Sequence, residues 1–213
     1  LVSPRDEWVE KLSRYQCNFV DISINNKGLN PLQDILTAIR YFLLFRALKP
    51  DVVMTFTVKP VVYGSIAAHI LKIPVLCTMT GLGTAFVEGG WMKRLVSLLY
   101  KVSLPKSKIV FTHNHDDSAL LISERIVDSK KIQCVGGSGI DLDKFTPAPY
   151  PPEPPIVVLM ISRLIRDKGV IEFFEAARKI VLRFPGVRFK IAGPIIQINR
   201  TALTNSEVQD LDS

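Results

Sequence analysis

The sequence contains no long apolar run that is free of charge. A helix that crosses a membrane needs about 18 to 20 consecutive apolar residues. The nearest case is residues 35–48, which Arg40 and Arg46 interrupt. The sequence therefore predicts no membrane span. It begins at Leu1 with no basic stretch followed by an apolar one, so we expect no secretory signal.

Cysteine is scarce, and the three cysteines, Cys17, Cys77 and Cys134, lie far apart in the chain. None belongs to a C-x-x-C pair, which argues against a zinc site built from thiolates. Widely spaced free thiols are typical of a protein in a reducing compartment. We therefore expect a cytoplasmic protein with no cysteine-bound metal.

The formal net charge is +7, and 47% of the residues are hydrophobic. That apolar fraction supports a real core and excludes a disordered or collagen-like chain. The excess positive charge favours an anionic partner, which is a nucleotide, an acidic lipid surface or nucleic acid. The charge alone does not choose among these partners.

Short apolar runs alternate with helical periodicity along most of the chain. The expected strands are residues 18–24, 51–57, 73–80, 108–113, 131–135, 156–162 and 187–192. The expected helices are residues 31–48, 60–71, 91–103, 116–126 and 168–183. This rhythm predicts an α/β fold in which helices cover both faces of a parallel sheet.

Proline is concentrated in residues 146–155, TPAPYPPEPP, where six of ten residues are proline. Such a segment favours extended geometry and resists helix or sheet. We therefore predict a first domain over residues 1–146, a linker over 147–155, and the start of a second domain over 156–213. The second domain has only two expected strands, so we expect it to be cut short.

The loop between strand 156–162 and the helix after it is basic, with Arg163, Arg166 and Lys168 close together. In open α/β sheets, ligands bind outside the carboxyl ends of the strands, and a helix N-terminus favours anions. Arg163 can hold a phosphate through two donors, and Lys168 adds a point charge. We predict a site for a phosphorylated ligand here, with a solvated basic loop as the alternative.

The helix that follows this loop has an expected start and an expected inner face. Asp167 is a plausible N-cap for it. Its apolar residues recur at helical spacing, and we expect them to pack on the sheet. They are Val170, Phe173, Phe174, Ala177, Ile180 and Val181.

Four other loops lie at predicted strand ends and could contact a ligand. Glycine allows close backbone approach and lets successive amides point at an anion. The segment GGSGIDLDKF is not a G-x-G-x-x-G fingerprint and has no Walker lysine, so a tight connection is an equal alternative. A lysine before a helix is more often solvated than functional. The candidate residues are Lys59, Gly81, Gly83, Asn114, Gly137, Ser138 and Gly139.

The expected helix 91–103 carries an apolar stripe with basic residues around it. The stripe comprises Trp91, Leu95, Leu98, Leu99 and Val102. The surrounding cations are Lys93, Arg94, Lys101, Lys106 and Lys108. Such a segment can lie on an anionic membrane. We favour the alternative that this stripe faces the core, because an α/β fold needs one such face on every helix.

Four stretches, in this order, resemble the family-4 retaining glycosyltransferases. They are TFTVKPVVYG, TMTGLG, GGSGIDLDKF and SRLIRDKG. More narrowly, the chain looks like bacterial transferases that build capsule, O-antigen or other glycans on polyprenyl-diphosphate carriers. Each stretch alone is unspecific, whereas the combination is specific.

The resemblance implies a GT-B fold with two Rossmann-like domains, an acceptor-side one followed by one that binds the nucleotide sugar. It implies that Arg163 and Lys168 hold the donor diphosphate, and it assigns no catalytic residue here. The expected donor is a nucleotide sugar, with a UDP-sugar as the favoured case, and the acceptor is a glycan or a lipid-linked sugar. No cofactor, metal or nucleic acid is expected. The protein is expected in the cytoplasm, peripheral to the inner face of the membrane.

The resemblance also implies that parts of the pattern lie outside this sequence. The family's first strand and glycine-rich loop would precede Leu1, and its pair of glutamates would follow Ser213. We therefore expect the 213-residue chain itself to have little or no transferase activity. The alternatives are an incomplete module that binds only a nucleotide or a membrane, and a sugar-nucleotide epimerase.

Overall fold

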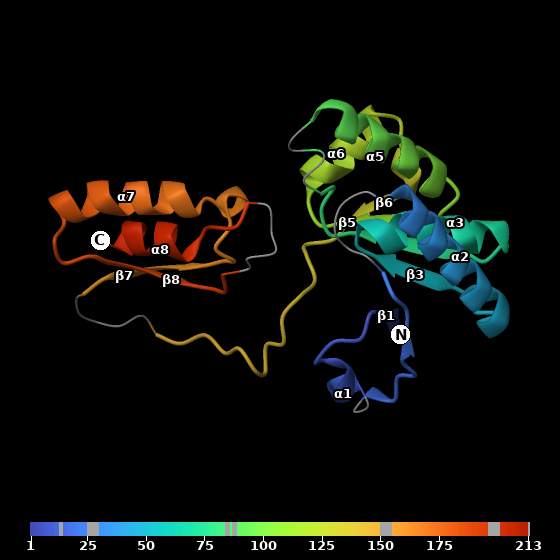
Figure 1. Cartoon of the computed structure of the whole chain (residues 1–213), viewed down its shortest axis with the longest axis horizontal. Helices are drawn as coiled ribbons and strands as arrows, with labels where there is room; N and C mark the ends of the chain where they lie inside the picture. Colours follow the sequence, from blue (N-terminus) through green and yellow to red (C-terminus); the bar gives the residue numbers. More distant parts are fainter. Residues whose placement is uncertain are drawn as a thin grey trace. The chain divides into compact units, whose positions relative to one another are not determined.

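The computed structural model describes residues 1–12, 15–24, 30–83, 86, 89–149, 155–195 and 201–212. The chain divides into two compact units, Leu1–Asp141 and Leu142–Ser213 (Figure 1). We call them the first and the second unit. Residues 150–154 of the expected linker lie outside the described residues, so the predicted domain limits stay predictions.

The first unit is built on a parallel sheet of four strands in the order β3-β4-β5-β6. Residues Thr55, Cys77 and Val110 occupy successive strands at one level of the register. The strands are β3 (Val53–Phe56), β4 (Val75–Met79), β5 (Ile109–Thr112) and β6 (Ile132–Cys134). All four lie inside the ranges expected from the sequence, and the α/β class is confirmed.

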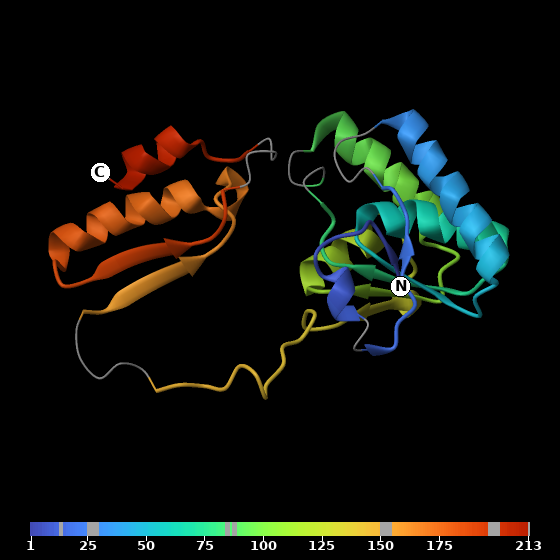
Figure 2. The ribbon, with the colours of Figure 1, turned by 60° about the horizontal axis from the view of Figure 1, so that its bottom comes forward.

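Helices connect these strands, and α2, α3 and α5 lie on one side of the sheet (Figure 2). The core of this unit contains buried valines and leucines, of which Val61, Val75 and Val110 are fully buried. The helical elements are α2 (Pro31–Leu48), a π-helical turn η2 (Pro60–Gly64), α3 (Ser65–Ile70), α5 (Gly90–Ser103), α6 (His115–Ser123) and a 3₁₀ turn η3 (Ser129–Lys131). The N-terminal segment adds β1 (Val2–Ser3), α1 (Val9–Leu12) and β2 (Val20–Asp21).

Helix α2 has the bounds that the sequence predicts, because both of its ends are set by local chemistry. The Asn30 side chain accepts a hydrogen bond from the Gln33 backbone N–H at 3.3 Å, and Pro31 occupies the first helical position. Lys49 ends the helix in a left-handed conformation with φ of 48°. None of the described helices is long and apolar enough to span a membrane.

The second unit contains two parallel strands, β7 (Val157–Ile161) and β8 (Arg188–Ala192). A 3₁₀ turn η4 (Arg166–Lys168) and helix α7 (Val170–Arg183) connect them. Helix α8 (Asn205–Asp212) follows.

Several expectations for the second unit were wrong or incomplete. Asp167 does not cap α7, because it lies in the 3₁₀ turn, and the N-cap position belongs to Gly169. Of the expected inner face of α7, Ile180 and Val181 are exposed. The sequence did not predict α8, which contacts the core through the partly buried Val208.

Candidate functional site

The loop after β7 is anchored by its backbone and by two buried side chains. Leu164 and Ile165 are buried, and the Leu164 N–H donates to the Pro194 carbonyl at 3.1 Å. The Arg166 N–H donates to the Thr201 carbonyl at 2.8 Å. The apolar residues therefore fix a loop whose charged side chains project outward.

The two predicted phosphate ligands, Arg163 and Lys168, lie at the two ends of this anchored loop, and both are exposed. Within the described ranges, neither side chain makes a hydrogen bond or an ion pair. Lys168 is two residues before the first residue of α7, where no side chain caps the helix. A free cation beside an uncapped helix N-terminus is an arrangement that favours an anion.

The third basic residue of the loop, Arg166, already has an ion-pair partner. Arg166 forms an ion pair with Glu207 of α8, and the Thr201 hydroxyl donates to Asp167 at 3.1 Å. Backbone and side-chain hydrogen bonds from Thr204, and then the nearby Arg166, lower the pKa of the Glu207 carboxyl. Arg166 and Asp167 therefore hold the loop against Glu207 and Thr201. This structural role differs from the phosphate-binding role predicted for Arg163 and Lys168.

Gly193 is a site-shaping residue that the sequence reasoning did not single out. A Cβ atom at this position would lie 1.7 Å from the Ser162 carbonyl oxygen. Only glycine fits where the ends of β7 and β8 approach so closely. The available signal was a glycine directly after a strand.

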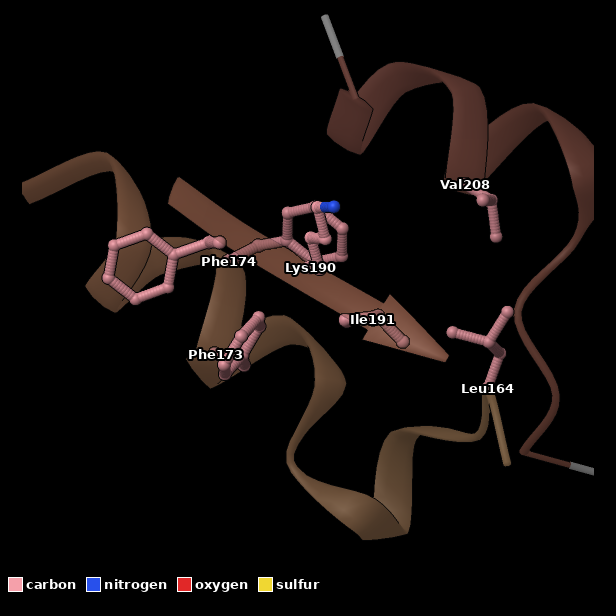
Figure 3. A pocket seen from close by; sticks show the side chains of 7 residues that line it. Leu164, Phe173, Phe174, Lys190, Ile191 and Val208 are labelled. Carbon is pink, nitrogen blue, oxygen red and sulfur yellow. The ribbon is translucent and has the colours of Figure 1, made fainter. Parts of the chain in front are cut away.

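The second unit also has a hollow of about 370 Å³ beneath α8 (Figure 3). Leu164 and Val208 face each other across it, and Phe173 packs edge-on against Phe189 with ring centroids 5.6 Å apart. Six of the seven residues that line it are apolar, and Lys190 is the one charged residue among them. An apolar hollow of this kind cannot hold a diphosphate, so it is separate from the proposed anion site.

In the first unit, the loops after β3 and β4 meet at the carboxyl edge of the sheet. A Cβ atom on Gly83 would lie 3.6 Å from a Val58 methyl group. Gly81 and Gly83 have φ angles of 149° and 87°, and the Tyr100 hydroxyl donates to the Leu82 carbonyl between them at 3.4 Å. Gly81 and Gly83 thus leave backbone accessible at the edge where ligands of α/β sheets bind.

Lys59 lies at the same edge, but its ammonium group is committed to an ion pair. Lys59 Nζ is 2.7 Å from Asp34 Oδ1 of α2, and the two side chains are only 12% and 7% exposed. Burial and a hydrogen bond to Asp34 raise the pKa of Tyr63. Thr57, two residues before Lys59, has a φ of 66°, which is rare for a β-branched residue. No sequence pattern indicated the role of Asp34.

The remaining candidates lie in two other loops. Asn114 caps α6, since its side chain accepts from the Asp117 N–H at 2.7 Å and its amide donates to the Asp117 carboxylate at 3.0 Å. Gly137 and Gly139 have φ of 103° and 78°, with exposed Ser138 between them. The described residues contain no cluster of three or more metal-ligating side chains.

The face of α5 that packs on the core is not the one favoured from the sequence. Its buried residues are Val96, Ser97, Tyr100 and Ser103, whereas Trp91, Leu98 and Val102 are exposed. Ser97 donates to Glu124 at 2.9 Å, so the inner face is partly polar. The core-facing interpretation of the apolar stripe was therefore wrong for these three residues.

Residues 1–114 match the family described as "Glycosyl transferase 4-like". The chain belongs to this family. A Campylobacter jejuni N,N'-diacetylbacillosaminyl-diphospho-undecaprenol alpha-1,3-N-acetylgalactosaminyltransferase is 27% identical over 197 residues, covering 83% of this chain and 51% of the relative. An Escherichia coli UDP-Gal:alpha-D-GlcNAc-diphosphoundecaprenol alpha-1,3-galactosyltransferase is 28% identical over 171 residues, covering 73% and 43%.

Among solved structures, Anabaena HepE in complex with UDP and glucose is similar to this glycosyl transferase 4-like chain, with a TM-score of 0.66. The identity is 16%, and the match covers 95% of this chain and 54% of HepE. At this identity the likeness establishes the fold, which is of the GT-B type. The chain spans about half the length of the curated relatives it matches.

Proposed function

We propose that this chain is part of a retaining glycosyltransferase that moves a sugar from a nucleoside-diphosphate donor, a UDP-sugar, to a polyprenyl-diphosphate-linked acceptor in surface polysaccharide synthesis. The observation that carries the proposal is the anchored loop after β7, with Arg163 and Lys168 exposed and unpartnered among the described residues. Membership of the glycosyl transferase 4-like family supports it. Both curated relatives carry an undecaprenol-linked diphosphate in their names.

The proposed chemistry requires fixed cations because the leaving group is a nucleoside diphosphate. Negative charge grows on the diphosphate as the bond to the sugar breaks. Positive groups that are already in place stabilise that charge without reorganisation. Arg163 would grip the diphosphate through its planar fork of donors, and Lys168 would add a point charge at the start of α7. No metal is required for this role.

A lipid-linked acceptor would bring the protein to a membrane surface, and α5 is suited to such a surface. Trp91, Leu98 and Val102 are exposed along it. The exposed cations Arg94 and Lys101 lie on the same helix. Exposed apolar side chains among cations are typical of helices that lie on anionic bilayers. We therefore propose peripheral association with the inner face of the membrane.

The second candidate function is a module that binds a nucleotide or a membrane without turnover. It follows from the length of the match, since the relatives are about twice as long as the matched segment. An epimerase is the weaker alternative, because both curated relatives are transferases.

Titration of UDP into the purified chain tests the anion site. We expect binding that Arg163→Ala or Lys168→Ala each weakens by about tenfold or more, because each removes a charge-assisted contact of roughly 1.5–3 kcal/mol. Lys179→Ala is the matched control, because it removes an exposed cation from α7 well after its first turn. Equal UDP affinity for all four proteins would remove Arg163 and Lys168 from the site.

Turnover of a UDP-sugar by the 213-residue chain alone would contradict the expectation that the chain is inactive. In a longer active protein that carries this chain, we expect either alanine variant to lower kcat/KM by the equivalent of about 2–4 kcal/mol.

A further inference from the structure

Helix α2 turns an apolar stripe toward solvent. Besides Leu48 at its last position, five of its large aliphatic side chains are 47–75% exposed. They recur at spacings of three and four residues, so they lie on one face of the helix. We call them the α2 outer stripe: Leu32, Ile35, Leu36, Ile39 and Leu43.

The opposite face of α2 is fixed to the rest of the first unit, so the outer stripe cannot rotate inward. Its buried residues are Asp34, Thr37, Tyr41 and Phe45. Asp34 holds the buried ion pair with Lys59, and Tyr41 lies 3.9 Å from the position of a Cβ atom on Gly64. The buried face thus contains a carboxylate, a hydroxyl and a phenol, while the exposed face is aliphatic.

This inversion of the usual pattern needs an explanation, because a helix that is apolar on its outer face normally has a partner there. A soluble helix exposes its polar face. Here, by contrast, the polar groups of the buried face are satisfied by Lys59 and by the Gln33 carbonyl, which accepts from the Thr37 hydroxyl at 2.8 Å. The outer stripe is therefore the part of α2 that lacks a partner among the described residues.

Helix α3 packs against both α2 and α5, and the three helices form one layer on the same side of the sheet (Figure 2). The outer stripe therefore belongs to the same layer as the exposed residues of α5, Trp91, Leu98 and Val102. Two helices with outward apolar residues flank α3, which itself exposes Ile70. Each of the three helices in this layer therefore exposes large apolar side chains.

The charges around this surface identify the partner. Residues 90–108, which include α5, contain five lysines and arginines and no aspartate or glutamate. Lys93 is paired with Glu124 at 2.7 Å, so the exposed cations on α5 are Arg94 and Lys101. Along α2 and at its C-cap, the exposed cations are Arg40, Arg46 and Lys49, and Arg40 also donates to the Ser23 carbonyl at 2.6 Å. Long basic side chains beside an apolar stripe can extend to anionic headgroups while the stripe enters the acyl boundary. A second copy of the chain fits less well, because a twofold contact would bring the same cations together.

We propose that the α2 outer stripe, together with the exposed face of α5, docks the first unit onto an anionic lipid bilayer. The choice of a lipid over a protein partner rests in part on the proposed function, in which the acceptor is lipid-linked. The docking surface itself is inferred from the exposed outer stripe of α2. From the sequence, residues 31–48 were predicted only to form a helix of the α/β fold.

Co-sedimentation of the 213-residue chain with lipid vesicles tests the proposal. Vesicles of phosphatidylglycerol and phosphatidylethanolamine are compared with vesicles of phosphatidylcholine alone. We expect binding to the anionic vesicles that falls as salt rises. The double variant Ile39→Ser/Leu43→Ser should lower that binding by at least about tenfold, since each side chain loses a favourable apolar burial.

The matched control is Leu182→Ser on α7, which changes a leucine that is 85% exposed in the second unit. It should bind vesicles like the unchanged chain. Circular dichroism reports whether each variant is folded, and UDP titration reports whether the anion site of the second unit is intact. UDP binding depends on Arg163 and Lys168, so loss of vesicle binding with intact UDP binding separates this inference from the proposed transferase function.

Three results would overturn the inference. The first is equal vesicle binding by the double variant and the unchanged chain. The second is no binding of the unchanged chain to anionic vesicles. The third is a dimer in sedimentation equilibrium that the double variant dissolves, because the occupant of the stripe would then be a second copy.

Discussion

Two lysines at predicted ligand loops, Lys59 and Lys168, differ in what surrounds them rather than in their chemistry. Lys168 is exposed beside the start of α7. Lys59 is nearly buried and paired with Asp34 at 2.7 Å. A buried, paired ammonium group holds α2 against the loop after β3, whereas an exposed one can exchange water for a ligand. Burial therefore decides which of the two is available for binding.

The Asp34–Lys59 pair gives a stability prediction. Asp34→Asn removes the negative partner and leaves a buried ammonium group unpaired, which typically costs about 3–5 kcal/mol. We expect a loss of that order in the free energy of unfolding of the first unit, measured in urea. The control is Asp21→Asn, which breaks an exposed pair with Arg5 at 3.8 Å and should cost about 0–1 kcal/mol. Equal losses in the two variants would mean that burial does not set the strength of the Asp34 pair.

Gly193 gives the second prediction at the scale of a single residue. Gly193→Ala places a methyl group against the Ser162 carbonyl, and the strand ends must separate to admit it. We expect destabilisation of the second unit by about 1–3 kcal/mol or more, as for other overpacked sites. Gly186→Ala is the control, because the structure places no described atom within 4 Å of its Cβ position. If both variants unfold at the same denaturant concentration, the close approach of β7 and β8 is absent in solution.

At the scale of the element, His69 links two helices of the first unit. Its Nε2 lies 2.9 Å from the Ser103 carbonyl at the end of α5. Burial lowers the pKa of His69, the hydrogen bond to Ser103 opposes that shift, and the nearby Lys106 and Lys131 add to it. The folded protein therefore favours the neutral imidazole.

The consequence is a loss of stability on acidification. The unfolded pKa is about 6.5, and the folded pKa lies below it, so protons bind more readily to the unfolded chain. The contribution of neutral His69 is complete above pH ~6.5 and is lost as the pH falls through the folded value. We expect the Tm to fall between pH 7.5 and 5.5, and to fall less in His69→Gln. His113→Gln, in the loop after β5, is the control, and an equal effect of both substitutions would contradict the assignment.

The helices also show what the sequence could predict and what it could not. The bounds of α2 follow from Asn30 and Pro31, which act on the backbone next to them. The inner face of α5 could not be predicted, because it includes Ser97 and Ser103, and the burial of Ser97 depends on the hydrogen bond that Glu124 accepts from it. Helix α8 was not predicted for the same reason, because Val208 packs on the core only when the fold brings Leu164 close to it.

The residues of the candidate site also fall into those that could be predicted from the sequence and those that could not. Arg163 and Lys168 could be proposed from the sequence because a basic loop between a strand and a helix is a local pattern. The roles of Arg166, Asp34 and Gly193 depend on groups 41, 25 and 31 residues away in the chain, namely Glu207, Lys59 and Ser162. No local pattern reports such distant partners.

At the scale of the whole molecule, the two units differ in how completely their sheets are buried. In the first unit, Val75, Cys77 and Val110 of the central strands are fully buried. In the second, Leu159 and Ile161 of β7 are 51% and 78% exposed. A two-stranded sheet with exposed apolar residues is marginal in water. The free energy of unfolding should therefore be smaller for the second unit than for the first.

Hydrogen exchange followed by mass spectrometry measures this difference in one experiment. Peptides from β7 and β8 should exchange faster than peptides from β4 and β5, because opening of the second unit requires less free energy. Gly193→Ala should accelerate exchange in β7 and β8 and leave β4 and β5 unchanged, whereas Asp34→Asn should act on the first unit alone. Exchange that rises together in all four strands would show that the chain opens as one cooperative body, and the division into units of unequal stability would then be wrong.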